Sequence, residues 1–175
     1  EIKNYVYVMG CKRLFRWKKK KNFKNCKIKN DLYCDITYHN NIFFINYYFT
    51  ENPEVTIVNI DAMYYCASEE NIMENIRSSY RYHFVKGNLC SFDLLANVLL
   101  FYKIDTVIHF AAQSHVQTSF TDALMYTQDN IIGTHNLLET ARTQCKTLEK
   151  FIHVSTDEVY GENENSDIKT EKSIL

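Results

Sequence analysis

Two adjacent acids, Asp157 and Glu158, are the residues of this sequence best suited to proton transfer. They follow a predicted strand over residues 151–155. Neighbouring carboxylates suit acid–base chemistry because different surroundings can separate their pKa values. Thr156, directly before them, can donate a hydrogen bond to a substrate oxygen. A solvent-exposed acidic turn is the alternative interpretation of a bare Asp-Glu pair.

A second candidate segment runs from Phe110 to His115 (FAAQSH) and follows a β-branched run that predicts a buried strand. The small Ala111 and Ala112 allow the backbone to approach a flat cofactor closely, and Ser114 can hydrogen-bond a phosphate or a sugar. Tight packing between strand and loop would explain the two alanines equally well. His115, taken alone, is more typical of a structural histidine than of a catalytic base.

A third candidate, Asp61, ends the predicted strand over residues 55–60. In dinucleotide-binding domains an acid at this place accepts hydrogen bonds from the adenosine ribose. Its charge also repels a 2′-phosphate, which favours NAD over NADP. An ordinary aspartate in a turn after a strand is the alternative.

These residues are linked by alternating strand and helix patterns. The predicted strands cover 55–60, 82–86, 106–110 and 151–155, and the predicted helices cover 91–103, with Ser91 as a possible cap, and 122–143. The longer helix carries one stripe of small, polar and apolar residues, namely Ala123, Thr127, Ile131, Thr134, Leu138 and Ala141. Such alternation predicts an α/β fold with a Rossmann-like, doubly wound parallel sheet, here partial and preceded by an irregular N-terminal segment.

Residues 1–41 do not follow this pattern, and we expect them to be an irregular basic segment outside the fold. Residues 1–29 hold eleven Lys or Arg and a single Glu. The stretch 5–9 resembles a first strand ending at Gly10, but the chain has four glycines in all and no glycine-rich phosphate loop. The composition suggests translated non-coding sequence, with a natural basic tail as the alternative. No recognition motif accompanies the lysines, so we predict no nucleic-acid partner.

Several other classes of function are disfavoured. The six cysteines have no metal-binding spacing, so no metal is predicted and reduced cytoplasmic thiols are expected. The apolar stretch 42–49 is too short to span a membrane. Tyr82 and Lys86 have the spacing of a Tyr-x-x-x-Lys pair, but that pair works on a helix and these residues lie on a predicted strand.

Taken together, the motifs resemble the dTDP-glucose 4,6-dehydratases, which are extended short-chain dehydrogenases/reductases. The resemblance runs from about Phe44 to Leu175, and its most specific part is Ser-Thr-Asp-Glu-Val-Tyr-Gly at 155–161. The other matching segments are NID at 59–61, YCAS at 65–68, YHFVKG at 82–87, HFAAQSHV at 109–116 and GT at 133–134. We therefore interpret residues 42–175 as a partial NAD(P)-binding domain without the C-terminal substrate domain, an N-terminal fragment of such an enzyme.

The resemblance implies a reaction and a set of roles. The sugar of dTDP-glucose, or of a related nucleotide sugar, is oxidised at C4 with hydride passing to NAD, water is lost across C5 and C6, and hydride returns to C6. Glu158 would remove the C5 proton and Asp157 would protonate the leaving hydroxyl. Thr156 and Ser114 would bind substrate. The residues implied at the cofactor are Asp61, Asn88, Leu89, Phe110, Ala111, Ala112, Ser114 and Ser155. A complete enzyme of this kind would be a homodimer.

The sequence also departs from the family. Asn88 replaces an Asp, and Asp129 replaces a Thr and places a charge near the expected cofactor. The glycine loop and the Tyr-x-x-x-Lys helix are both missing, so we expect this chain to bind NAD poorly and to lack dehydratase activity. The alternatives are a related epimerase or decarboxylase, which usually has Ser where Asp157 stands, and a truncated, non-catalytic paralogue.

Overall fold

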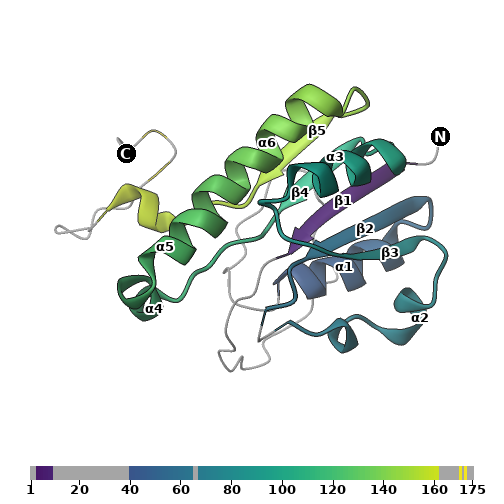
Figure 1. The fold of residues 1–175 in the computed structure, drawn as a ribbon. Coiled ribbons are helices and arrows are strands. Elements are labelled where there is room, and N and C mark those ends of the chain that lie inside the picture. Colours follow the sequence, from purple (N-terminus) through teal and green to yellow (C-terminus); the bar gives the residue numbers. More distant parts are fainter. Residues whose placement is uncertain (1–2, 10–39, 65–66, 162–169, 171, 173–175) are drawn as a thin grey trace.

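The fold is a single parallel sheet with helices on both faces. The computed structural model describes residues 3–9, 40–64, 67–161, 170 and 172. The strands are β1 (Lys3–Met9), β2 (Val55–Asp61), β3 (Tyr82–Lys86), β4 (Thr106–His109) and β5 (Lys150–His153), in the spatial order β3-β2-β1-β4-β5. All four neighbouring pairs are parallel. The predicted Rossmann-like α/β class is therefore confirmed (Figure 1).

Strand β1 corrects the prediction that residues 1–41 lie outside the fold. Its backbone pairs with β2 along its whole length, from Lys3 opposite Val55 to Met9 opposite Asp61, and with β4 on its other side. The segment rejected as a first strand is thus the central strand of the sheet. The rejection rested on the missing glycine loop, but strand pairing depends on backbone hydrogen bonds and needs no such loop. Residues 10–39 lie outside the described residues, so their predicted irregularity stays a prediction.

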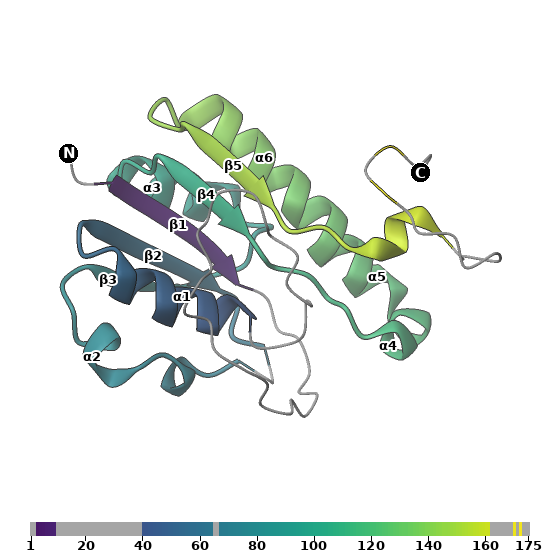
Figure 2. The ribbon, with the colours of Figure 1, turned by 180° about the vertical axis from the view of Figure 1, so that it is seen from behind.

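One face of the sheet is covered by α1 (Asn40–Glu51) and by the short α2 (Glu74–Arg77), as Figure 2 shows from behind. The fully buried Ile45 of α1 and Ile76 of α2 pack with Ile57 of β2. The opposite face is covered by α3 (Phe92–Phe101) and α6 (Gly133–Gln144). There Leu99 and Leu137 form a second core cluster. Apolar strands buried on both faces are the usual consequence of helical crossovers.

Helix α3 has the predicted position but not the predicted cap. The Ser91 side chain makes no capping hydrogen bond, and its backbone carbonyl accepts from Leu95 N at 3.1 Å. The buried face of the helix consists of Leu95, Val98 and Leu99, which lie at the spacing that the sequence indicated. Packing on the sheet therefore holds this helix in place without a side-chain cap.

The predicted helix over 122–143 is interrupted by a π-helical stretch. It consists of α5 (Ala123–Tyr126), the π-helix η2 (Thr127–Ile132) and α6. A π-turn contains an extra residue and so rotates the side chains that follow. The buried face of α6 is formed by Gly133, Leu137, Thr140 and Ala141. The stripe read from the sequence is not the packing face, because its members Ile131 and Leu138 are 62% and 47% exposed.

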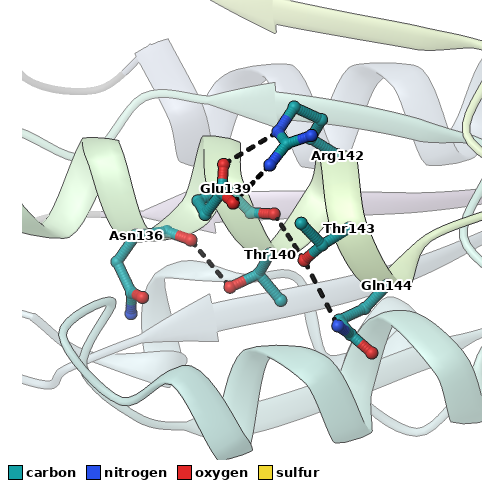
Figure 3. A network of polar contacts seen from close by, with 6 residues as sticks. All are labelled: Asn136, Glu139, Thr140, Arg142, Thr143 and Gln144. Carbon is teal, nitrogen blue, oxygen red and sulfur yellow. Dashed lines mark hydrogen bonds and ion pairs between the residues drawn. The ribbon is translucent and has the colours of Figure 1, made fainter.

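Hydrogen bonds join residues of α6 to one another along the helix, as Figure 3 shows. Arg142 donates from Nε and Nη2 to the two carboxylate oxygens of Glu139, at 2.8 and 2.6 Å. Thr140 and Thr143 donate to the backbone carbonyls one turn earlier, at 2.7 and 2.8 Å.

Among the described residues, no helix is long and apolar enough to cross a bilayer.

Candidate cofactor and substrate site

The candidate residues lie beyond the carboxyl ends of neighbouring parallel strands. Asp61 ends β2, Asn88 follows β3, the segment 110–114 follows β4, and the segment 155–158 follows β5. Chain order reverses between β1 and β4, because β2 and β3 extend the sheet on one side of β1 and β4 and β5 on the other. Doubly wound sheets bind their ligands outside the strand ends at such a reversal.

Asp61 is 4% exposed, and its Oδ1 accepts from Met63 N at 2.7 Å. Burial raises the pKa of this carboxyl, and the hydrogen bond from Met63 partly offsets that effect. Met63 adopts a positive φ of 57°, so the chain turns sharply after the strand. Asp61 is therefore a buried hydrogen-bond acceptor at the carboxyl end of β2, and its contact with a ribose remains a prediction.

The segment after β4 is half-buried and firmly held. Phe110 packs against Phe44 of α1, with ring centroids 5.7 Å apart, and Ala111 packs on the core cluster beneath α3 and α6. Asn130 accepts from Gln113 N at 2.7 Å and donates to Gln113 O at 2.8 Å. Ser114 is exposed. The π-helix thus fixes the loop at its midpoint and leaves Ser114 accessible.

A hydrogen-bonded network joins three loops at this edge. Asp129 in the π-helix accepts from Gln113 Nε2 at 2.9 Å and from the Tyr64 hydroxyl at 3.1 Å. Tyr64 in turn accepts from Asn88 Nδ2 at 2.8 Å. Burial, followed by the charge of Asp129, raises the pKa of Tyr64, so the phenol keeps its proton. The carboxylate of Asp129, which the sequence led us to expect near the cofactor, therefore accepts hydrogen bonds from two donors.

Asn88 and Leu89 occupy different environments. The Asn88 Oδ1 accepts from Cys90 N at 2.8 Å, and its amide is only partly buried. Leu89 is 8% exposed and belongs to the core, and its carbonyl accepts from Asn136 Nδ2 at 2.5 Å. The Leu89 side chain is thus occupied by packing. A contact between Leu89 and the cofactor remains a prediction, and it would have to be made by main-chain atoms of Leu89.

The acid pair stands on a short 3-10 helix, η3 (Asp157–Tyr160), which begins four residues after β5 ends. Val154 N donates to His109 O at 3.0 Å, which continues the pairing of β5 with β4 by one residue. Ser155 and Thr156 are exposed. The side chains of Asp157 and Glu158 lie outside the described atoms, so their catalytic roles remain predictions.

Tyr82, His115 and His109 each have a structural hydrogen-bond partner. Tyr82 is buried in β3 and its hydroxyl accepts from Asn59 Nδ2 at 2.9 Å, so it lies on a strand as expected. His115 caps α4 (Val116–Thr121) by accepting from Thr118 N at 3.2 Å. His109 is fully buried, with its Nε2 2.8 Å from Thr134 Oγ1.

Sequence reasoning did not find the roles of Tyr64, Gln113 and Asn130. Tyr64 and Asp129 are 65 residues apart in the sequence, and no local period connects them. The signal available was the neighbouring pair Asp129-Asn130 in the middle of a helix. Two short polar side chains there compete with helical hydrogen bonding and so point to tertiary partners.

The sheet topology and the position of the strand-end segments are those of a Rossmann-like α/β protein of the short-chain dehydrogenase type. Residues 42–175 match the family model for GDP-mannose 4,6 dehydratase, and this chain belongs to that family.

Relatives within the family are dehydratases. The chain is 45% identical over 112 residues to the trifunctional UDP-glucose 4,6-dehydratase/UDP-4-keto-6-deoxy-D-glucose 3,5-epimerase/UDP-4-keto-L-rhamnose-reductase RHM3 of Arabidopsis thaliana, covering 64% of this chain and 17% of that protein. It is 44% identical over 109 residues to the dTDP-D-glucose 4,6-dehydratase of Homo sapiens, covering 62% of this chain and 30% of that enzyme. The chain therefore spans less than a third of the length of these curated relatives.

A similar solved structure is that of DesIV, a dTDP-glucose 4,6-dehydratase from Streptomyces venezuelae with NAD and TYD bound. It superposes with a TM-score of 0.73 at 26% identity, covering 98% of this chain and 45% of that chain. The dTDP-glucose 4,6-dehydratase of Bacillus anthracis in complex with NAD gives a TM-score of 0.70 at 23% identity, over 99% and 43% of the two chains, and supports the fold.

Proposed function

We propose that the chain forms the cofactor-binding part of an NAD-dependent dTDP-glucose 4,6-dehydratase. The observation that carries this proposal is the gathering of Asp61, the loop 110–114 and the segment 155–158 at one sheet edge, in a chain of the dehydratase family. When bound, NAD supplies reversible hydride transfer at the sugar. The remaining chemistry is proton transfer and positioning by side chains.

The described residues fit the adenosine half of NAD. The buried Asp61 carboxylate is an acceptor for ribose hydroxyls, and the Met63 N–H already holds one of its oxygens. Ala111 and Ala112 present little side chain beside the strand end, where a flat ring can approach. The residues that would meet the pyrophosphate lie in 10–39, outside the described residues.

Proton transfer is assigned to the acid pair. Oxidation at C4 makes the C5 proton of the sugar acidic, and Glu158 would accept that proton. Asp157 would deliver a proton to the departing C6 hydroxyl, while the exposed Thr156 binds the sugar near its 4-oxygen. The Asp at 157 also favours dehydration over the related epimerase and decarboxylase reactions, whose enzymes usually have Ser there.

A chimera tests the assignment. Residues 42–175 replace the matching segment of the human dTDP-D-glucose 4,6-dehydratase, and formation of the 4-keto sugar from dTDP-glucose is measured. We expect turnover, and Glu158→Gln should reduce it about 100-fold or more and stop solvent exchange at C5. Glu149→Gln is the control, because Glu149 is exposed and precedes β5 at the opposite edge. An inactive parent chimera would support a non-catalytic paralogue instead.

We further propose a homodimer and a cytoplasmic location for the whole enzyme. Large apolar side chains are exposed along consecutive helical segments, at Phe120, Leu124, Ile131, Ile132 and Leu138. Large exposed apolar side chains are typical of protein–protein contacts, and these residues are the candidates for the dimer interface. Cys90 and Cys145 are free thiols, which supports a reducing compartment. Light scattering of the purified protein and fractionation of cells test the two points.

A further inference from the structure

A bridge of three side chains joins the loops on either side of β1 at the carboxyl edge of the sheet. Asp129 Oδ1 accepts from the Tyr64 hydroxyl at 3.1 Å, and its Oδ2 accepts from Gln113 Nε2 at 2.9 Å. Tyr64 belongs to the segment after β2 and Gln113 to the segment after β4, and β1 lies between these two strands (Figure 1). The Tyr64–Asp129–Gln113 bridge therefore spans the place where chain order reverses.

The two ends of this bridge are held differently. At the β4 end, the main chain of Gln113 is bonded in both directions by the Asn130 side chain, at 2.7 and 2.8 Å. At the β2 end, the half-buried Tyr64 is attached through its hydroxyl, which donates to the bridge carboxylate and accepts from Asn88 Nδ2 at 2.8 Å. Loss of one hydroxyl would thus release the β2 end, whereas the β4 end would stay in place.

We propose that the Tyr64–Asp129–Gln113 bridge is a latch that holds the ligand-binding edge closed, and that a dinucleotide enters after the Tyr64 end is released. The proposal rests on the proposed function, because doubly wound sheets bind dinucleotides outside the strand ends at such a reversal. Asp61 is 4% exposed in the closed state, so its carboxylate needs a local rearrangement before a ribose can reach it. The bridge restrains residues 62–64, the segment that directly follows Asp61.

A latch of this kind lowers affinity without touching the bound ligand. When only the open fraction of molecules can bind, the apparent dissociation constant is the intrinsic one divided by that fraction. Tyr64→Phe removes the hydroxyl and keeps the ring, so it should enlarge the open fraction. Tyr80→Phe is the matched control, because Tyr80 is 87% exposed and precedes β3 at the opposite edge of the sheet.

The experiment uses the full chain in its wild-type, Tyr64→Phe and Tyr80→Phe forms. Hydrogen–deuterium exchange without ligand measures how often residues 62–64 open. Titration with NADH, followed by fluorescence anisotropy, gives the dissociation constants, and stopped-flow mixing gives the association and dissociation rates. Thermal melts establish whether each variant is folded.

We expect Tyr64→Phe to exchange the amides of residues 62–64 about tenfold faster than the wild type and to bind NADH about tenfold more tightly, as for the loss of a hydrogen bond to a charged group. The gain should appear in the association rate, with the dissociation rate unchanged, and Tyr80→Phe should match the wild type.

Equal or weaker binding of NADH by Tyr64→Phe would overturn the latch, because a residue that only supports the site cannot increase affinity when it is removed. An unfolded Tyr64→Phe variant would overturn it as well, since the hydroxyl would then hold the fold and not the site. Absence of NADH binding by all three chains would instead reject the proposed function, and the latch with it.

Discussion

His109 is a fully buried histidine whose pKa is strongly shifted by the fold. It is the last residue of β4, its Nδ1 has no hydrogen-bond partner among the described residues, and the centroid of the His153 ring is 4.9 Å from that of its own ring. Burial, followed by the charge of His153, lowers the pKa of His109 from 6.5 to about 4. The folded protein therefore holds this side chain neutral at a pH where the unfolded chain protonates it.

The first prediction follows from that difference. Above pH 6.5 the imidazole is neutral in both states, and as the pH falls toward 4 the unfolded state binds the proton more readily. The free energy of unfolding should therefore fall over this window, with His109 contributing up to roughly 3 kcal/mol. His109→Gln should remove that part of the pH dependence. Urea titrations at pH 7 and 4.5 measure it, with His135→Gln, at an exposed position on α6, as the control. An equal loss in both variants would contradict the assignment.

At the scale of elements, Arg81 joins the end of α1 to the starts of β2 and β3. Its Nη1 donates to Val55 O at 2.7 Å and to Asn52 O at 3.2 Å. Its guanidinium carbon lies 3.8 Å from the centre of the Phe49 ring. A planar, delocalised cation can stack and donate at the same time, which a lysine ammonium cannot.

The second prediction is that Arg81→Lys lowers the free energy of unfolding by about 1–2 kcal/mol, because one backbone contact and the stacking are lost. Chemical denaturation measures the change. Arg142→Lys is the matched control, since the Arg142 side chain is 71% exposed and its ion pair with Glu139 should contribute little. Equal effects of the two substitutions would show that Arg81 does not hold the three elements together.

At the scale of the whole molecule, β1 joins the two halves of the sheet. It pairs with β2 and with β4, so its backbone amides are engaged on both sides.

Our third prediction concerns Val6, which lies opposite Val58 of β2 and Val107 of β4. Val6→Pro should prevent cooperative folding, because a central strand cannot lose an amide donor without leaving its partner unpaired. Val6→Ala keeps the amide and should remain folded. Circular dichroism during thermal melting separates the two, and a folded proline variant would refute the central role of β1.

The fourth prediction concerns affinity for NAD. The chain has no glycine-rich phosphate loop anywhere in its sequence. Such a loop lets backbone N–H groups and a helix N-terminus meet the pyrophosphate. We expect binding roughly 100-fold weaker than in a variant whose residues 10–39 are replaced by the glycine loop of a relative. Calorimetry compares the two chains, and equal affinity would show that other groups hold the phosphates.

Local patterns in the sequence were sufficient to predict the positions of most strands of the sheet. Strands β2 and β4 are short runs rich in β-branched residues, and β3 and β5 are short segments that alternate with the predicted helices. Once the strands are parallel, Asp61, Ala111 and Thr156 must share one edge, because they all follow carboxyl ends. The composition-based exclusion of residues 1–41 was wrong for 3–9, since membership of a sheet depends on a partner strand that composition does not reveal.

Tertiary structure alone decided the packing face of α6 and the network around Asp129. The stripe fails on both sides of the π-helix, since Ala123 before it and Leu138 after it are exposed, so the packing face depends on how α6 lies against α3 and the sheet. Likewise, Asp129 finds Tyr64 only when β2 and the long helix meet across the sheet edge. The strand-end motifs could be predicted from local sequence because the direction of the backbone alone puts them at one edge of the sheet. Side-chain hydrogen bonds could not, since they depend on which distant segments the fold brings within about 3 Å of each other.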